Sequence, residues 1–419
     1  MDGAKVVKVF GEAYSKEAYA IRDFLARGVV EYEWCEVSGD SDCLHQLGVL
    51  DFENTRWPIV VFPDGSTLYA PTLADIATKL GWVSRPRYHE YDLSIYGAGP
   101  AGLSAAVYAA SEGLRAVVIE RAAVGGQAGT SSLIENYMGF PQGIAGAELA
   151  ERARQQAVKF GVELLLMREG IRATFMNGKI EVSLADGSLL RARANICATG
   201  IEYRSLGVPG EQRLLNSGLF YGAGASEAPM CDGKNVFVVG GGNSAGQAVM
   251  NFARTAKKVT MIVRGPTLAA TLSHYLLDRI TQTKNVEVLF GSAVTQLFGD
   301  TQLEAIRIVR TSGEDEVVDA ERLFVCIGGA PNTDWAKETT IVRDRNGYLV
   351  TGADLGEFPE FERCWPLERR PYFLETSVPG SFAAGDVRFG SVKRVASAVG
   401  EGAMAVTFVH RYLAESANQ

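Results

Sequence analysis

The spacing of apolar residues divides the chain into three segments, and the first covers residues 1–87. Two short stretches of this segment alternate apolar and polar residues, which predicts strands, and two others repeat apolar residues at helical spacing. Asp64-Gly65, between two apolar runs, predicts a hairpin turn. The predicted elements are a strand over 5–11, a helix over 15–26, a strand over 32–37, a hairpin over 57–69 and a helix over 72–81. Residues 81–90 indicate a linker.

The second segment opens with an apolar strand that leads into a glycine-rich turn. Residues 91–120 predict a strand, the turn Gly97-x-Gly99-x-x-Gly102, a helix and a second strand that ends at Glu120. Glycines in such a turn let the backbone approach a pyrophosphate, and the helix N-terminus supplies unpaired N–H groups. Glu120 is expected to accept hydrogen bonds from ribose hydroxyls. The alternative is a glycine-rich turn with no ligand.

The third segment repeats this pattern over residues 235–264, where GGGNSA forms the turn. At the position that corresponds to Glu120, this segment has Val263, followed by Arg264. An acid would repel a 2′-phosphate, whereas an arginine binds it with charge-assisted hydrogen bonds. The alternative for Arg264 is a solvated side chain at a strand end. The candidate nucleotide-binding residues here are Gly240, Gly242, Asn243, Ser244 and Arg264.

Two dinucleotide turns in one chain predict two dinucleotides, FAD at the first and NADPH at the second. The length of 419 residues suggests two or three domains, and hydrophobic residues make up 47% of them. The net charge of -8 does not favour nucleic acid or an anionic membrane as a partner. No apolar run is long enough for a transmembrane helix and the first residues do not resemble a signal peptide, so a cytoplasmic protein is expected.

Over residues 90–415 the chain resembles the low-molecular-weight thioredoxin reductase family, class II of the pyridine nucleotide-disulfide oxidoreductases. The matching motifs occur in the family's order: VGGQAGTSSLIENYMGFP, ICATG, LFVCIGGAPNT, and PGSFAAGDV followed by KRVASAVGEGAMA. The resemblance implies a homodimer, an FAD domain split over 90–204 and 327–419, an NADPH domain over 205–326, and rotation of the two domains. The FAD contacts that it implies lie at Gly97, Gly99, Pro100, Ala101, Gly102, Glu120, Arg121, Gly126, Gln127, Asn136, Gly200, Gly385, Asp386, Arg394, Val395 and Ala396. Among these, Asp386 would hold the ribityl chain, and Arg394 to Ala396 would lie along the isoalloxazine edge.

Residues 1–87 resemble a small glutaredoxin, which implies a thioredoxin fold with a proline, usually cis, at Trp57-Pro58. The expected fold class is therefore α/β, with two Rossmann-like three-layer domains and an N-terminal thioredoxin-fold domain. The glutaredoxin Cys-x-x-Cys positions correspond to Ser15 and Ala18. Because serine cannot form a disulfide, this domain is expected to be redox-inactive. Its groove, near Tyr14 and Trp57-Pro58, is expected to bind a partner protein.

The reductase family carries its own Cys-x-x-Cys just before the second glycine turn, and this chain has none there. The corresponding positions are Gly222 and Ala225. No two of the six cysteines are three positions apart, and Cys231, the nearest thiol, cannot close a disulfide alone. Cys197 and Cys326 lie in apolar runs, where buried thiols are expected. Reduction of thioredoxin by the usual route is not expected.

Three further features each have two interpretations. Arg264-Gly265 replaces the family's two adjacent arginines, so half of the phosphate clamp is missing and NADPH binding is expected to be weak or lost. The extra segment 353–373, with Cys364, is either a partner-docking or flavin-covering element or a surface loop that packs its own aromatic side chains. His274 is either close to the nicotinamide or a packed or solvated histidine.

These features predict a FAD-dependent, NADPH-linked oxidoreductase that lacks the dithiol and passes electrons to an unidentified acceptor. Hydride transfer to a flavin requires mainly that the nicotinamide be stacked against it, so no catalytic side chain is expected. The alternatives are a flavin-binding regulator or scaffold with little turnover, and a reductase of ferredoxin or flavodoxin. Ala101 stands where bacillithiol disulfide reductases have a cysteine, which disfavours that class. The end of the chain at HRYLAESANQ disfavours a ferredoxin reductase.

Overall fold

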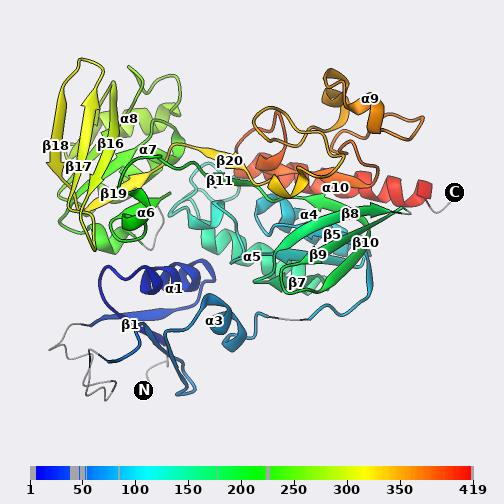
Figure 1. Cartoon of the computed structure of the whole chain (residues 1–419), viewed down its shortest axis with the longest axis horizontal. Coiled ribbons are helices and arrows are strands. Elements are labelled where there is room, and N and C mark those ends of the chain that lie inside the picture. The colour runs from blue at the N-terminus through cyan, green and yellow to red at the C-terminus, as the bar shows by residue number, and fades with distance from the viewer. Residues whose placement is uncertain are drawn as a thin grey trace. The chain divides into compact units, whose positions relative to one another are not determined.

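The chain forms two compact units, each with its own sheets (Figure 1). Among the described residues, no helix has both the length and the apolar character needed to cross a membrane. The first unit comprises Met1–Asp75, Thr130–Ser132 and Tyr203–Gly328, and the second comprises Ile76–Gly129, Leu133–Glu202 and Gly329–Gln419. The computed structural model describes residues 6–37, 47, 52, 54–83, 85–176, 178–222 and 227–416.

The N-terminal part of the first unit is a four-stranded sheet in the order β2-β1-β3-β4 (blue in Figure 1). β1 pairs with β2 in parallel and with β3 antiparallel, and β3 and β4 form the predicted hairpin. The Trp57-Pro58 peptide bond is cis. The elements are β1 (Val7–Gly11), α1 (Lys16–Arg27), β2 (Tyr32–Glu36), β3 (Ile59–Val61), β4 (Thr67–Tyr69) and α3 (Leu73–Lys79).

Ser15, at the first glutaredoxin dithiol position, is the N-cap of α1. Its Oγ accepts a hydrogen bond from the backbone N–H of Ala18 at 3.1 Å. A serine oxygen at this place satisfies one of the N–H groups that a helix start leaves unpaired. Ala18, at the second position, is fully buried, and a Cβ at Gly11 would lie only 2.9 Å from the Ala18 Cβ. Both residues therefore have structural roles that need no thiol.

The rest of the first unit is built on a parallel sheet in the order β12-β19-β13-β14-β15, followed by the antiparallel sheet β16-β17-β18. The central strands are continuous apolar runs, as expected for strands covered on both faces. Val238, Met261 and Phe324 are fully buried in this core. The elements are α6 (Glu211–Leu214), β12 (Leu219–Tyr221), η2 (Ala228–Cys231), β13 (Asn235–Val239), α7 (Asn243–Phe252), β14 (Lys258–Ile262), α8 (His274–Gln282), β15 (Val286–Leu289), β16 (Ser292–Phe298), β17 (Ala305–Arg310), β18 (Asp315–Asp319) and β19 (Arg322–Val325).

The second unit contains a seven-stranded sheet in the order β7-β6-β5-β10-β9-β8, with β21 also paired to β10. A small sheet pairs β11 (Ile201–Tyr203) with β20 (Gly329–Pro331). The other elements are β5 (Glu90–Tyr96), α4 (Pro100–Ser111), β6 (Ala116–Glu120), η1 (Ala128–Thr130), α5 (Gly146–Lys159), β7 (Glu163–Leu166), β8 (Gly170–Met176), β9 (Lys179–Leu184), β10 (Leu189–Cys197), η3 (Asp334–Ala336), η4 (Gly352–Glu357), α9 (Phe361–Cys364), β21 (Ser381–Ala383), η5 (Gly385–Val387) and α10 (Val395–Ser416).

The long helix α10 packs directly against α4 (Figure 1). A Cβ at Gly402 would lie 2.1 Å from the carbonyl oxygen of Ala101, so only glycine fits this approach. The Ser104 hydroxyl donates a hydrogen bond to the carbonyl of Val399 at 2.7 Å. Because these two residues are 295 positions apart in the chain, remote segments form one wall of the second unit.

The extra segment 353–373 packs its own aromatic side chains, as one of its two interpretations supposed. The guanidinium of Arg369 lies over the rings of Trp365, 5.4 Å from the centroid, and Tyr372, 4.2 Å from it. It also donates hydrogen bonds of 2.7 and 3.0 Å to the carboxylate of Glu375, whose side chain is fully buried. A further bond of 2.9 Å joins Arg369 to Glu415 on α10. One arginine thus joins the segment to α10 and to the buried Glu375.

Replacing Arg369 with alanine is expected to destabilise the second unit by about 3 kcal/mol, because the buried carboxylate of Glu375 then loses its cation. The measurement is denaturant-induced unfolding of the full chain. Arg370→Ala is the matched control, since the Arg370 side chain is exposed and its carbonyl, which accepts from Arg369, is kept. Equal unfolding midpoints for the two variants would contradict the assignment.

Candidate functional site

The turn between β5 and α4 is closed by backbone on two sides. Gly97 has φ +103°, and a Cβ there would lie 2.3 Å from the carbonyl oxygen of Ala198. A Cβ at Gly102 would lie 1.8 Å from the carbonyl oxygen of Gly97. α4 begins at Pro100 with no side-chain cap on its first N–H groups. These N–H groups are therefore available to an anion, which the helix dipole also favours.

Gly99, at the tip of the same turn, faces open space. A Cβ built there would meet only the Cα of Gly126, at 3.9 Å, and Gly99 itself has φ -76°. Gly126 lies on the opposite side with φ +54°. The absence of side chains at both positions lets the two backbones approach closely, since a Cβ at Gly126 would lie 3.2 Å from the Cα of Gly99. A turn without side chains of this kind lets a diphosphate group lie against the peptide planes.

Glu120 stands at the end of β6, beside this turn. Its two carboxylate oxygens accept hydrogen bonds from the backbone N–H groups of Ala98, at 2.8 Å, and Ala122, at 2.9 Å. A carboxylate has about four acceptor positions, so Glu120 braces the turn and still has lone pairs for two hydroxyls. The neighbouring Arg121 pairs with Glu202 at 2.5 Å, and about half of each side chain is exposed. Solvent screens that ion pair, and it adds little to stability.

The C-terminal motif comes to the same helix. Gly385, with φ +79°, lies so close to Ala101 that its Cβ would stand 2.9 Å from the alanine Cβ. Glu401 accepts a hydrogen bond from the N–H of Gly385 at 2.7 Å and forms a buried ion pair of 2.7 Å with Arg388. The Gly385–Asp386 turn is therefore held from α10. This pair was not predicted from the sequence, although the acid within SAVGEG was a visible signal.

Asp386 lies on η5, and residues 393–396 lie just before and at the start of α10. Burial raises the pKa of the Asp386 carboxyl above its ordinary range. Lys393 donates a hydrogen bond to the Asp386 carbonyl at 2.8 Å and lies over the Tyr348 ring, 4.6 Å from the centroid. Arg394 and Ala396 are exposed, and the half-buried Val395 is the first residue of α10. These positions can therefore be reached by a ligand at the α4 turn.

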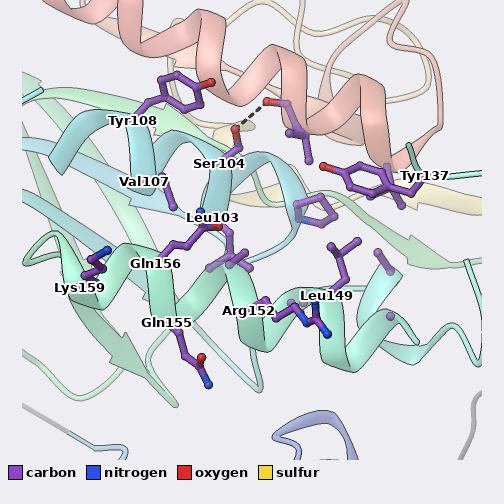
Figure 2. A pocket seen from close by; sticks show the side chains of 18 of the residues that line it. Leu103, Ser104, Val107, Tyr108, Tyr137, Leu149, Arg152, Gln155, Gln156 and Lys159 are labelled. Atoms are coloured by element: carbon purple, nitrogen blue, oxygen red, sulfur yellow. Dashed lines mark hydrogen bonds between the residues drawn. The ribbon is translucent and has the colours of Figure 1, made fainter. Parts of the chain in front are cut away.

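A cavity of about 820 Å³ runs between α4, α5 and the first turn of α10 (Figure 2). Pro100 and Val395, two of the candidate FAD residues, line one part of it together with Gly125 and Tyr137. Figure 2 shows the polar side chains of α5, among them Arg152, at its outer edge. The cavity thus extends from the glycine turn along the apolar side of α4.

The remaining candidates of this unit occupy its connecting segments. The Gln127 side chain donates a hydrogen bond to the carbonyl of Ile201 at 2.9 Å, which fixes the loop after Gly126 to β11. Gly200 has φ +65°, and its carbonyl oxygen accepts a hydrogen bond from the backbone N–H of Asn332. Asn136 is exposed on the loop that precedes α5. Gln127 and Gly200 are therefore fixed by protein contacts, and Asn136 is open to solvent.

The second glycine turn, between β13 and α7, has the same design. Gly240 has φ +143°, and its Cβ would lie 2.3 Å from the carbonyl oxygen of Cys326. A Cβ at Gly242 would meet nothing within 4 Å, and α7 has no side-chain cap. Asn243 accepts from the N–H of Ser273 at 2.8 Å, and Ser244 is exposed. The turn fits a second nucleotide.

Arg264 is exposed and is separated from the end of β14 by Val263, at the carboxyl edge of the parallel sheet. Its neighbour Val263 is buried and packs near the turn, since a Cβ at Gly241 would lie 3.1 Å from it. His274 starts α8 with 88% of its side chain exposed, and its Nδ1 lies 3.0 Å from Asp278. Of the two interpretations of His274, the solvated one describes this side chain.

Gly222, which the resemblance to the reductase family predicts as the first dithiol position, lies against another side chain. Gly222 has φ +80°, and a Cβ there would lie 2.4 Å from the hydroxyl of Tyr203. This phenol lies 3.4 Å from the Thr130 hydroxyl, and burial raises its pKa to about 12. A cysteine at Gly222 would thus need an unfavourable backbone and the space of Tyr203. Ala225 lies outside the described residues.

Most thiols in the described part of the chain are protected by burial, and Cys35 is among the buried ones. Cys197, Cys231 and Cys326 are buried, and burial raises the pKa of each to about 12. Cys364 on α9 is half-buried, and burial raises its pKa as well. Since the thiolate is the reactive form, none of these last four is prepared for thiol exchange at neutral pH.

Gly99→Ala is expected to leave the unfolding midpoint of the cofactor-free chain unchanged and to lower the flavin content of the purified protein at least about tenfold, since a Cβ would occupy the space next to the peptide plane. The measurement is flavin absorbance per polypeptide. Gly102→Ala is the contrasting variant, because its Cβ meets the protein's own backbone and is expected to destabilise the chain itself. Normal flavin content in Gly99→Ala would remove the turn from the cofactor site.

Comparison with known proteins gives a consistent result. The family model described as pyridine nucleotide-disulphide oxidoreductase matches residues 91–402. The chain is 33% identical over 331 residues to the thioredoxin reductase of Mycolicibacterium smegmatis, covering 78% of this chain and 97% of that protein. It is 31% identical over 377 residues to a subunit of the alkyl hydroperoxide reductase of Staphylococcus epidermidis, covering 86% of this chain and 68% of that protein.

Among solved structures, the thioredoxin reductase of T. acidophilum has a TM-score of 0.69 and 29% identity, over 78% of this chain and 99% of its own. The described geometry agrees with this similarity, because both glycine turns join a parallel strand to a helix. The chain therefore belongs to the pyridine nucleotide-disulphide oxidoreductase family, as a thioredoxin reductase-like flavoprotein oxidoreductase, a family that implies FAD and NAD(P)H as cofactors.

Proposed function

We propose that this protein oxidises NADPH through a bound FAD and passes the electrons to an external acceptor without a dithiol of its own. One observation carries the proposal: both glycine turns are open to a ligand, while the dithiol position Gly222 is filled by the Tyr203 hydroxyl. The nucleotide-binding parts of a reductase are therefore kept, and its thiol relay is absent from the sequence. Reduction of thioredoxin by the usual route is not part of the proposal.

In this proposal the α4 turn and Glu120 hold the FAD pyrophosphate and ribose, and Asp386 with residues 394–396 holds the flavin end. The support is that α10, η5 and α4 meet at Ala101, Gly385 and Gly402 at distances that leave no room for side chains. When bound, FAD supplies acceptance of a hydride from a nicotinamide. The contribution of the protein is to orient both rings and to exclude water, not to supply an acid or base.

The second turn is proposed to bind NADPH in preference to NADH. The buried Val263 replaces the acid that would repel a 2′-phosphate, and the exposed Arg264 follows it. Arg264 is followed by Gly265 and not by a second arginine, so the phosphate has one guanidinium here. A preference for NADPH of moderate size follows from this arrangement.

We propose the domain division 1–87, 90–204, 205–326 and 327–419, with the first domain a redox-inactive thioredoxin fold. The sheet order β2-β1-β3-β4 supports that fold. The similarity to the alkyl hydroperoxide reductase protein, which covers 86% of this chain, extends into the segment before residue 91. In this division the chain passes from the FAD domain to the NADPH domain just after β11 and returns just before β20.

A homodimer formed by the second unit is also part of the proposal. The cavity between α4 and α5 is bordered by Tyr108 and Phe160, which are 47% and 45% exposed. Apolar side chains gathered at the rim of a cavity are typical of an interaction surface. The occupant that this surface suits is the same surface of a second copy, as in closed two-fold dimers.

The function is tested by anaerobic titration of the purified yellow protein with NADPH or NADH, followed by the flavin absorbance near ~450 nm. Bleaching at near-stoichiometric NADPH is expected. No bleaching with either nucleotide would contradict the proposal and would favour the flavin-binding regulator or scaffold. Subsequent turnover with ferredoxin, flavodoxin, quinone or oxygen identifies the class of acceptor.

Arg264→Ala is expected to raise the NADPH concentration at half-reduction about tenfold, because a charge-assisted hydrogen bond contributes roughly 1.5–3 kcal/mol. The NADH concentration at half-reduction should not change, since NADH has no 2′-phosphate. Arg254→Ala, at an exposed arginine after α7, is the matched control. An equal effect of Arg264→Ala on both nucleotides would show that Arg264 acts elsewhere.

A further inference from the structure

Within the first unit, helix α1 lies against the segment that contains β12 and η2. The phenol of Tyr19, on the first turn of α1, donates a hydrogen bond to the carboxylate of Glu227. The Tyr19 ring lies 5.0 Å from the ring of Phe220 on β12, at an interplanar angle of 47°. Glu227 is only 4% exposed. A buried acid of the nucleotide-binding part is therefore bound by a side chain of the small N-terminal sheet domain.

A second set of contacts is formed by Tyr14, directly before α1. Its carbonyl accepts a hydrogen bond from the Ser217 hydroxyl at 3.0 Å. Its ring lies under the guanidinium of Arg322, 5.0 Å from the centroid. Arg322 is 6% exposed and also donates to the carbonyl of Met230 on η2 at 3.2 Å. The same arginine thus holds both the N-terminal domain and η2.

Both sets of contacts include interactions of types that are strong in proteins. Burial, followed by the charge of Glu227, raises the pKa of Tyr19 well above its ordinary value, so its hydroxyl stays protonated and donates at neutral pH. A hydrogen bond to a buried carboxylate is charge-assisted and is among the stronger ones in proteins. Arg322 is buried, and desolvation of the cation strengthens its cation–π interaction with Tyr14.

Both sides of this interface adjoin a position where a dithiol is missing. On α1 the positions are Ser15 and Ala18, between Tyr14 and Tyr19. On the other side, Gly222 directly follows the strand that carries Phe220, and Glu227 is the N-cap of η2, which ends at the buried Cys231. The surfaces that adjoin these positions are joined by hydrogen bonds and ring contacts.

We propose that the N-terminal domain is a permanent clamp, whose residues Tyr14 and Tyr19 hold β12 and η2 in place and keep Cys231 buried. Its partner is this chain's own nucleotide-binding part, in contact through Ser217, Phe220, Glu227 and Arg322. The sequence predicted the Tyr14 groove as a site for an external protein. In the structure, the carbonyl and ring of Tyr14 are already engaged within the chain.

The reactivity of the Cys231 thiol indicates whether this clamp is closed. Its side chain is fully buried, in the cluster of apolar side chains against which Tyr19 and Met230 pack. Burial raises its pKa to about 12, so its thiolate is scarce while the segment stays closed. Loosening of η2 would return the pKa toward its ordinary value and open the thiol to reagents.

The test is alkylation of the full-length flavin-loaded protein with N-ethylmaleimide, followed by peptide mapping of each cysteine. In the unmodified chain, Cys231 should label as slowly as the buried Cys197 and Cys326. In Tyr19→Ala it should label at least about tenfold faster, the change expected from loss of a hydrogen bond to a charged group. Tyr69→Ala, at a tyrosine of β4 that is 56% exposed, is the matched control and should have no effect.

Cys197 and Cys326 separate local opening from unfolding, because they lie in the cores of different units. If Tyr19→Ala speeds the labelling of all three thiols, the variant unfolds. The clamp is then tested with Tyr19→Phe, which keeps the ring against Phe220 and removes only the hydroxyl. Faster labelling of Cys231 alone in Tyr19→Phe supports the clamp. Unchanged Cys231 labelling in a folded variant, or rapid labelling of Cys231 in the unmodified chain, would overturn it. The readout does not depend on whether NADPH reduces the flavin.

Discussion

The start of α4 is enclosed by backbone at distances that exclude side chains, and the proposed function depends on this constraint. Gly97, Gly102, Gly385 and Gly402 each stand where a Cβ would lie within 3 Å of a neighbouring atom of the second unit. The four glycines allow α4, α10 and the last strand to converge on one point. In the Gly97-x-Gly99-x-x-Gly102 turn, a Cβ at Gly99 would not clash, because its nearest neighbour would be the Cα of Gly126 at 3.9 Å.

The absence of a dithiol is accompanied by structural replacements at the described positions. Gly222 has a backbone conformation that favours glycine, and the Tyr203 hydroxyl occupies the place of its Cβ. Ser15 caps α1 with its Oγ, and Ala18 is buried behind it. Restoring cysteines would therefore disturb packing that now stabilises each part. At the positions where the resemblance predicts thiols, the structure has the Ser15 helix cap, the buried Tyr203 phenol beside Gly222, and the contacts of α1 with Glu227.

The sequence predicted the parts of the fold that local patterns determine. The strand–turn–helix units at Gly97 and Gly240, the hairpin at Asp64-Gly65 and the helix after Ser15 are all present in the structure. It did not predict contacts between distant side chains, such as Arg388 with Glu401, Arg369 with Glu375, or Tyr19 with Glu227. Residue spacing in the sequence does not predict such contacts, because they depend on how the folded sheets bring remote segments together. Which candidate residues touch a cofactor stays a prediction for the same reason.

We propose that the bound flavin, and no disulfide, is the redox centre at which this protein takes up an electron pair. Anaerobic reductive titration with dithionite counts the electrons taken up per flavin. Reduction should be complete after two electrons per flavin, with no further uptake. Uptake of two additional electrons, together with the appearance of two new thiols that react with alkylating reagents, would reveal a redox-active disulfide and show that the proposal is wrong.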